Sequence, residues 1–121
     1  MSIISTVLCL IVALEHLYIM YLETIATSSE KTAKTFNVRP EELNNSMIQT
    51  LFKNQGVYNG LFAVGILYGL FISANSLEIA TMFILFVIVA AVYGGLTSSK
   101  SIILKQGGPA ILALISLLIL H

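Results

Sequence analysis

The spacing of the charged residues most constrains this chain, because it leaves four long and mainly apolar stretches. Each stretch has about the 20 residues that an α-helix needs to cross the hydrocarbon core of a bilayer. The stretches are residues 3–22, 54–73, 77–96 and 101–120. They predict an all-α fold: residues 1–121 form a single integral membrane domain, a bundle of four transmembrane helices.

Composition excludes several other classes of protein. The 121 residues are 57% hydrophobic and only 10% charged, whereas soluble domains carry roughly 25% charged residues. A soluble monomer is therefore not expected, and the expected partner is the lipid bilayer. Six basic and six acidic residues give a net charge of zero, so no nucleic-acid partner is expected. The single cysteine, Cys9, excludes an intramolecular disulfide.

The basic residues predict how the chain is oriented in a cell membrane. The first stretch lacks a basic segment before it and an A-x-A-like cleavage site after it, so we expect a permanent helix and not a signal peptide. All six Lys and Arg residues fall in two connections on one side of a four-span arrangement: Lys31, Lys34, Arg39, Lys53, Lys100 and Lys105. Because basic loops stay in the cytoplasm, we expect a multi-pass protein with both termini outside.

The first connection contains a further helical pattern. Pro40 is followed by acidic residues. Because proline favours the first position of a helix and acidic residues favour its first turn, we expect a helix to begin at Pro40. Leu43, Met47 and Leu51 then repeat every four residues. Residues 40–53 therefore predict a short amphipathic helix on the cytoplasmic surface, or an extension of the second transmembrane helix.

Ionisable residues inside a membrane span are costly and mark candidate functional sites. Glu15 and His16 stand near the middle of the first stretch. Both can point into the bundle, where a carboxyl and an imidazole could share a proton. A hydrogen-bonded pair that only fixes helix packing is the alternative.

Other polar side chains gather at the cytoplasmic level of the bundle. They come from all four stretches and are candidate ligand-binding residues: Tyr18, Glu23, Gln55, Tyr58, Asn59, Tyr93, Thr97 and Gln106. The opposite half of each stretch is almost wholly apolar. This arrangement predicts a polar pocket that opens to the cytoplasm, with Glu15 and His16 at its floor.

Glycine and proline mark the places where helices approach closely or bend. Gly56 with Gly60, and Gly65 with Gly69, form G-x-x-x-G pairs that permit close helix contact. The sequence Gln-Gly-Gly-Pro at 106–109 interrupts the fourth stretch. Because the residues after it are too few to cross a bilayer, we expect the span to include earlier residues and to be kinked or locally unwound there. The alternative is that a helix simply begins at this point.

Four motifs in order resemble a bacterial family that is catalogued as a domain of unknown function. They are E-H-L-Y from Glu15, N-Q-G-x-Y-N-G from Asn54, Y-G-x-x-T from Tyr93 and Q-G-x-P-A from Gln106. The resemblance covers essentially the whole chain and implies a small four-helix protein of the bacterial inner membrane. It implies no reaction, substrate or cofactor. Family members often have tryptophan after the first helix, whereas this chain has none.

A looser likeness links the chain to small multidrug-resistance exporters, which are also four-helix proteins with one glutamate in the first helix. The residues around Glu15 differ from that pattern, and His16 has no counterpart in it. The one-sided distribution of Lys and Arg also argues against insertion in both orientations. The likeness therefore concerns chemistry and not kinship.

Three functions remain open from the sequence, and whether the protein is an enzyme is among them. The favoured one is binding or transport of a small molecule, with Glu15 and His16 as the proton site. A dimer is expected if the molecule crosses the membrane, since four helices enclose little volume. The alternatives are an enzyme acting on a lipid-like or quinone-like substrate, with the same two residues as acid and base, and an accessory subunit. The residues form no metal-binding pattern, and a cofactor, including haem on His16, is left undetermined.

Overall fold

A computed structural model describes residues 1–98 and 100–121, and all regular structure in these residues is helical. The four long helices are α1 (Ile3–Thr24), α3 (Ser46–Phe71), α4 (Ser76–Thr97) and α5 (Gly108–Ile119). The shorter elements are α2 (Glu30–Phe36), the 3-10 helix η1 (Pro40–Asn44) and the π-helical turn η2 (Ile103–Gly107). The all-α class predicted from the sequence is confirmed. Ser99, in the predicted linker between the third and fourth stretches, lies outside the described residues.

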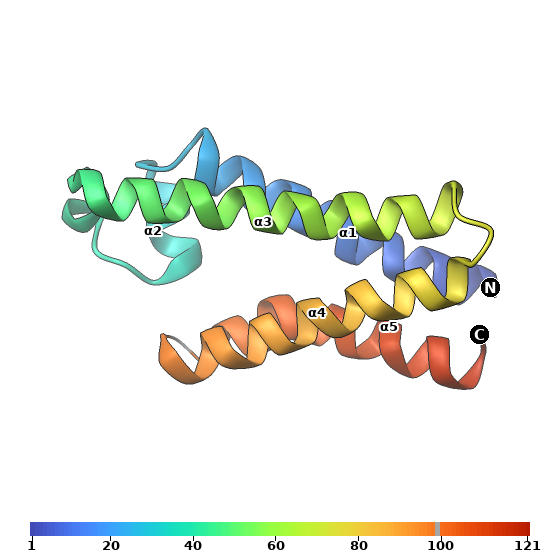
Figure 1. Ribbon diagram of the computed structural model, residues 1–121. Coiled ribbons are helices and arrows are strands. Elements are labelled where there is room, and N and C mark those ends of the chain that lie inside the picture. Colours follow the sequence, from blue (N-terminus) through green and yellow to red (C-terminus); the bar gives the residue numbers. More distant parts are fainter. Residues whose placement is uncertain (99) are drawn as a thin grey trace.

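The long helices form a four-membered ring in which each packs against two neighbours. α1 contacts α3 and α5, and α4 contacts the same two helices from the other side. Both chain termini and the connection from α3 to α4 lie at one end, which we call the terminal end (Figure 1). α2 and η1 lie at the opposite end, called the loop end (Figure 1). The six basic residues of the sequence belong to segments at the loop end.

Side-chain caps set where the helices of the first connection begin. The Asn45 side chain accepts hydrogen bonds from the backbone N–H groups of Met47 and Ile48, at 2.9 and 3.2 Å. Because Asn45 has extended backbone angles, a helix cannot pass through it. Residues 40–53, predicted as one amphipathic helix or as an extension, are therefore divided: η1 holds the first part, and the part from Ser46 extends α3.

Helix α2, which was not predicted from the sequence, packs against α1. The buried Thr32 hydroxyl donates to the backbone oxygens of Ala26 and Leu22, at 2.7 and 3.1 Å. Asn37 ends the helix in the left-handed region, with φ 55° and ψ 47°, a conformation that asparagine tolerates well. These contacts fold the first connection back over the loop end of the bundle.

Many residues that face the interior of the bundle are small, beside large ones such as Ile66, Ile84 and Leu117, and many other large apolar residues face outward. The buried residues of the long helices include Ser5, Cys9, Ala13, Gly56, Gly60, Ala63, Gly69, Ala80, Ala91, Ala110, Ala113 and Ser116. Large exposed residues include Val7, Ile11, Leu14, Leu61, Val64, Tyr68, Leu85, Val89, Leu112, Ile115 and Leu118. By length and composition, α1 and α4 could each cross a membrane.

The fourth apolar stretch forms one helical segment with a wide turn inside it. The segment is helical from residue 101, passes through η2 and continues as α5 to Ile119. At about 1.5 Å per residue it is roughly 28 Å long, close to the thickness of the hydrocarbon core. At the terminal end, the buried hydroxyls of Ser5 and Ser116 lie 2.6 Å apart and join α5 to α1.

The second G-x-x-x-G pair brings α3 against α4. A Cβ atom added at Gly69 would lie 3.0 Å from the backbone nitrogen of Ala80 and 2.9 Å from Ile79 Cγ2. Backbone atoms cannot move aside as the end of a flexible side chain can. The helices could therefore accommodate a side chain at this position only by separating.

We predict that Gly69→Ala lowers the free energy of unfolding by about 1–3 kcal/mol, the usual cost of overpacking. Gly94→Ala is the matched control, since its Cβ would lie 3.7 Å from Ile102, at ordinary contact distance. The measurement is thermal unfolding of the purified protein in detergent, followed by circular dichroism. Equal melting temperatures for the two variants would contradict the close packing of α3 on α4.

Candidate functional site

A cavity of about 230 Å³ lies at the loop end, where five elements converge. Its walls come from α1, α2, α3, α4 and η2. The lining residues are Glu23, Phe36, Gln55, Tyr58, Asn59, Phe62, Ala90, Gly94, Ile102 and Gln106. Carboxyl and amide groups thus meet three aromatic rings in one place, and one of these rings is the phenol of Tyr58.

The Glu23 carboxyl is the central polar group of this cavity. Its side chain belongs to α1, and the residue is only 1% exposed. Asn59 of α3 donates a hydrogen bond from Nδ2 to Glu23 Oε1 over 2.6 Å. A buried carboxyl without a partner is strongly destabilising, so this bond provides what Glu23 needs in order to remain buried.

The first G-x-x-x-G pair permits this contact between α1 and α3. A Cβ added at Gly56 would lie 3.0 Å from Glu23 Cβ and 2.5 Å from Thr24 Cγ2. One turn further along α3, a Cβ at Gly60 would overlap the side chain of Met20. With no side chain at either glycine, the backbones approach closely, and Asn59 reaches Glu23.

Two threonine hydroxyl groups, one in the last turn of α1 and one just after it, bond the backbone of the helix end beside the cavity. Thr24 Oγ1 donates to the backbone oxygen of Met20 over 2.6 Å. The buried Thr27 Oγ1 donates to the backbone oxygen of Glu23 over 2.7 Å. The Thr27 bond pairs a carbonyl group that the end of α1 would otherwise leave unpaired, and the Thr24 bond adds a second donor to a carbonyl group within the helix.

Neighbouring rings fix the aromatic walls. Phe36 of α2 makes an edge contact with Phe52, with ring centroids 5.5 Å apart. Phe62 of α3 lies beside Phe86 of α4, with centroids 6.4 Å apart. Both distances fall in the range that favourable aromatic pairs adopt, so the two walls are held in place from outside the cavity.

The π-helical turn places Gln106 in the cavity wall. Ile103, in the same turn, occupies the space beside Gly95, where any added Cβ would overlap its side chain. η2 therefore lies directly against α4. π-helical turns occur frequently at functional sites, and this one contributes an amide that faces Glu23 and Asn59 across a shared cavity.

Glu15 and His16, predicted as the floor of the pocket, do not line this cavity. At the standard helical rise, Glu15 lies about 12 Å deeper along α1 than Glu23. His16 is buried, and its Nδ1 donates to the backbone oxygen of Val12 over 2.9 Å. Glu15 Oε1 is 4.0 Å from that nitrogen, too far for a hydrogen bond. Among the described side chains, Glu15 Oε1 is a buried oxygen without a hydrogen-bond partner.

The other predicted ligand-binding residues divide into two groups. Glu23, Gln55, Tyr58, Asn59 and Gln106 line the cavity together. Tyr18, Tyr93 and Thr97 do not line it. Tyr18 is 47% exposed and stacks on Tyr21, Tyr93 is 69% exposed, and Thr97 donates to the backbone oxygen of Tyr93. Those side chains therefore lie on the outer surface.

Sequence reasoning did not include Phe36 among the candidate residues. This residue lies in the polar first connection, and its position against the cavity depends on how α2 folds back. Phe62 shares a face of α3 with Asn59, one helical turn away. That spacing is a signal from which Phe62 could have been found.

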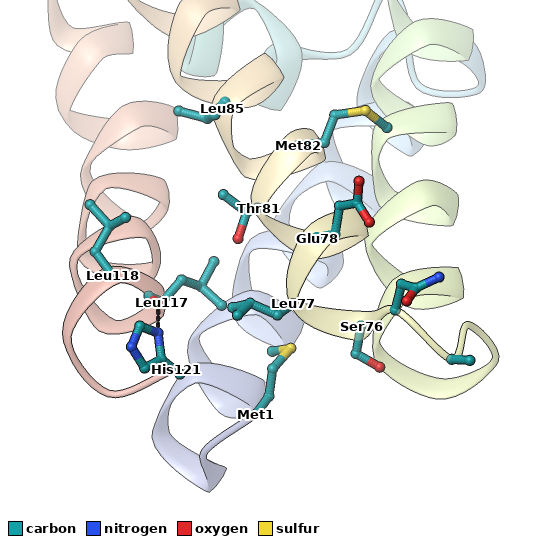
Figure 2. A pocket seen from close by; sticks show the side chains of 12 residues that line it. Met1, Ser76, Leu77, Glu78, Thr81, Met82, Leu85, Leu117, Leu118 and His121 are labelled. Atoms are coloured by element: carbon teal, nitrogen blue, oxygen red, sulfur yellow. Dashed lines mark hydrogen bonds between the residues drawn. The ribbon is translucent and has the colours of Figure 1, made fainter.

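A second, wider groove lies at the terminal end, between the start of α4 and the end of α5 (Figure 2). Its volume is about 910 Å³. Most of its labelled side chains are apolar, among them Leu77, Leu85 and Leu117, and the dashed line marks His121 bonded to the backbone of Leu117 (Figure 2). None of the residues predicted as ligand-binding lines this groove.

Within the described residues, no three His, Cys, Asp or Glu side chains gather closely enough to hold a metal ion. The cavity contains one such side chain, Glu23. Its chemistry is therefore that of a carboxyl group, three amides, a phenol and aromatic rings. These groups bind and orient small molecules by hydrogen bonds and ring contacts.

The fold and the cavity define a class: a small all-α protein with apolar outer faces and a polar cavity at its basic end. The sequence pattern of the family described as "Protein of unknown function (DUF1304)" matches residues 10–118. The chain therefore belongs to this family, which confirms the resemblance found in the sequence. It is 57% identical, over 116 residues, to "Uncharacterized protein YpaA" of Lactococcus lactis subsp. lactis (strain IL1403). That match covers 96% of this chain and 98% of the relative. No solved structure matches the chain.

We predict that Asn59→Ala lowers the free energy of unfolding by about 1–3 kcal/mol, because the buried Glu23 carboxyl loses its hydrogen-bond donor. In a Glu23→Ala background, the same change should cost much less. Asn54→Ala, at an exposed position of α3, is the control. Denaturant titration in detergent measures all four variants, and equal costs in both backgrounds would show that the two side chains are not coupled.

Proposed function

We propose that this protein crosses the membrane four times, with its loop end in the cytoplasm, and binds a small molecule in the cavity at that end. The observation that carries the binding proposal is the buried Glu23–Asn59 pair, which faces a cavity with polar and aromatic walls. If the only role of this position were to pack α1 against α3, an apolar residue would serve without the free-energy cost of burying a carboxyl group. A binding site, in contrast, can use the buried carboxyl group of Glu23 to form hydrogen bonds with a polar ligand.

The outer faces of the helices support four spans. Each long helix, including α3 and α5, exposes large aliphatic or aromatic side chains. Water would make such continuous apolar faces unfavourable, and lipid would cover them. α3 is less apolar than α1 and α4 because its first turns carry polar residues such as Lys53 and Asn54. Further along, Gln55 and Asn59 are also polar, and both line the cavity. Polar residues that face inward are compatible with a membrane span.

The loop end carries the charges that the cytoplasmic side of a membrane protein usually carries. All six Lys and Arg residues belong to segments at that end. The terminal end has no Lys or Arg in the sequence of its connection or its helix ends. Since the basic end faces the cytoplasm in most membrane proteins, the cavity opens toward the cytoplasm in this proposal.

Glu15 and His16 serve as a proton site below the cavity in this proposal. The buried, unpartnered Oε1 of Glu15 supports this role, because a neutral carboxyl group could remain there more easily than a charged one. The pair lies deeper in α1 than Glu23, so a proton bound there would be shielded from the cytoplasm. Transport, which would use this site, needs further helices, and a homodimer would supply them.

The orientation can be tested with cysteines at the two ends. In a Cys9→Ala background, Lys34→Cys marks α2 and Asn75→Cys marks the connection between α3 and α4; both positions are exposed. A membrane-impermeant thiol reagent added to intact cells should label position 75 and not position 34. Inverted membrane vesicles should give the reverse pattern. Labelling of both positions from the same side would contradict the four-span arrangement.

The cavity can be tested with a cysteine in its wall. In the same background, Gln106→Cys should react with a small water-soluble thiol reagent in inverted vesicles, because the cavity admits water. Val64→Cys is the control: this residue is exposed on the outer face of α3 and should be protected by lipid. If Gln106→Cys reacts no faster than Val64→Cys, the cavity is closed to the cytoplasm and the proposed binding site is wrong.

A further inference from the structure

We infer that the ligand of the loop-end cavity is a small organic cation, a primary or secondary ammonium that pairs with Glu23. The inference rests on the function proposed above and adds the chemical class of the ligand. Its basis is the juxtaposition of one carboxyl group with three aromatic rings in a cavity that, among residues 1–98 and 100–121, is lined by no basic side chain.

The charge of the lining residues selects against anions. Glu23 is the one ionisable acid among them, and no Lys, Arg or His lines the cavity in the described part of the chain. The nearest basic residues in the sequence, Lys53 and Lys105, are exposed at the surface. Exposed charges are screened by salt, whereas a buried carboxyl acts at short range on whatever enters the cavity. An anion would meet this carboxyl without a compensating positive group.

The aromatic walls favour a cation over an uncharged ligand. Phe36, Tyr58 and Phe62 all line the cavity. Tyr58 is 64% exposed, so Phe36 and Phe62 are the more buried aromatic walls of the cavity. The face of an aromatic ring attracts a nearby cation, most strongly where water is excluded. Neighbouring rings hold Phe36 and Phe62 in place, so little side-chain entropy is lost when a ligand binds between them.

The amide groups explain why the cation should carry N–H donors. Asn59 donates from Nδ2 to Glu23 Oε1. Its side-chain oxygen, Oδ1, can therefore accept a hydrogen bond from a ligand. Gln55 and Gln106 add two further amide oxygens to the walls. An ammonium group with N–H bonds could donate to the carboxylate and to an amide together, which a quaternary ammonium ion could not do.

The size of the cavity limits the ligand to a small molecule. Its volume of about 230 Å³ lies below the roughly 300–1,000 Å³ of pockets for drug-sized ligands. A short alkyl chain on the ammonium group would lie against Phe62 and the apolar Ala90 and Ile102. n-Propylammonium satisfies these conditions of size, charge and hydrogen bonding.

The test compares three probes of similar shape on the full chain in detergent micelles. They are n-propylammonium chloride, uncharged 1-propanol and sodium propionate, with potassium chloride as the control for ionic strength. A ligand that binds the folded state raises the melting temperature as its concentration rises. We expect n-propylammonium to raise it, with an apparent affinity at least about tenfold above that of 1-propanol, as one charged hydrogen bond predicts. Propionate should have no effect.

Two glutamate variants show whether Glu23 recognises the cation. Glu23→Gln retains a group that can accept the bond from Asn59 but removes the negative charge, so the preference for n-propylammonium should disappear. Glu78→Gln is the matched control, because Glu78 is exposed at the terminal end and should leave the preference unchanged. If Glu23→Gln fails to fold, Phe62→Leu replaces it and should weaken binding of the cation more than binding of 1-propanol.

The outcomes separate this inference from the function on which it rests. If 1-propanol or propionate binds as well as n-propylammonium, or if Glu23→Gln retains the preference, the cation inference is wrong and the small-molecule cavity stands. If no probe binds although Gln106→Cys is labelled from the cytoplasmic side, the cation inference is also wrong. If no probe binds and Gln106→Cys is protected, both proposals fail.

Discussion

The close approach of α1 to α3 is the contact on which the rest of the loop end depends. Gly56 and Gly60 give α3 a surface without side chains, against which Met20, Glu23 and Thr24 pack. This approach brings Asn59 within 2.6 Å of Glu23. It also helps to shape the cavity, because α4 packs on α3 and η2 in turn packs on α4. A larger residue at either glycine would therefore change the packing and the chemistry of the site together.

Much of this arrangement follows from the sequence, and the remainder depends on packing. The polar residues near one end of each apolar stretch predicted a cluster at one level, and Gln55, Asn59 and Gln106 do line one cavity. Helical periodicity places residues on a stripe, but it does not say which stripe faces a neighbour. Tyr93 and Thr97 share such a stripe, and in the structure it faces outward. The roles of Glu15 and His16 stay predictions, since packing puts Glu23 at the cavity instead.

The distribution of residue sizes adds an argument that hydropathy alone does not supply. α3 does not have the uniform apolar character of α1 and α4, yet its outer face carries Leu61, Val64 and Tyr68. Gln55 and Asn59 line the cavity, and further polar residues such as Lys53 and Asn54 are exposed in the part of α3 at the loop end. An average over the whole helix therefore hides the apolar character of its outer face. Small residues where helices touch, with large apolar side chains on the outer faces, are a pattern by which helices associate where lipid, and not water, surrounds them.

The wide turn η2 also changes the phase of the last helical segment. A π-helical turn holds more residues than an α-helical one, so the residues after it are rotated relative to those before it. Ile103, at the start of the turn, lies against Gly95, whereas Ala110, Ala113 and Ser116, after the turn, are buried in the bundle. The residues that contact the bundle before the turn and those that contact it after the turn therefore do not lie on one face of a regular α-helix. A loss or gain of one residue within the turn would realign them, which makes chain length here as consequential as residue identity.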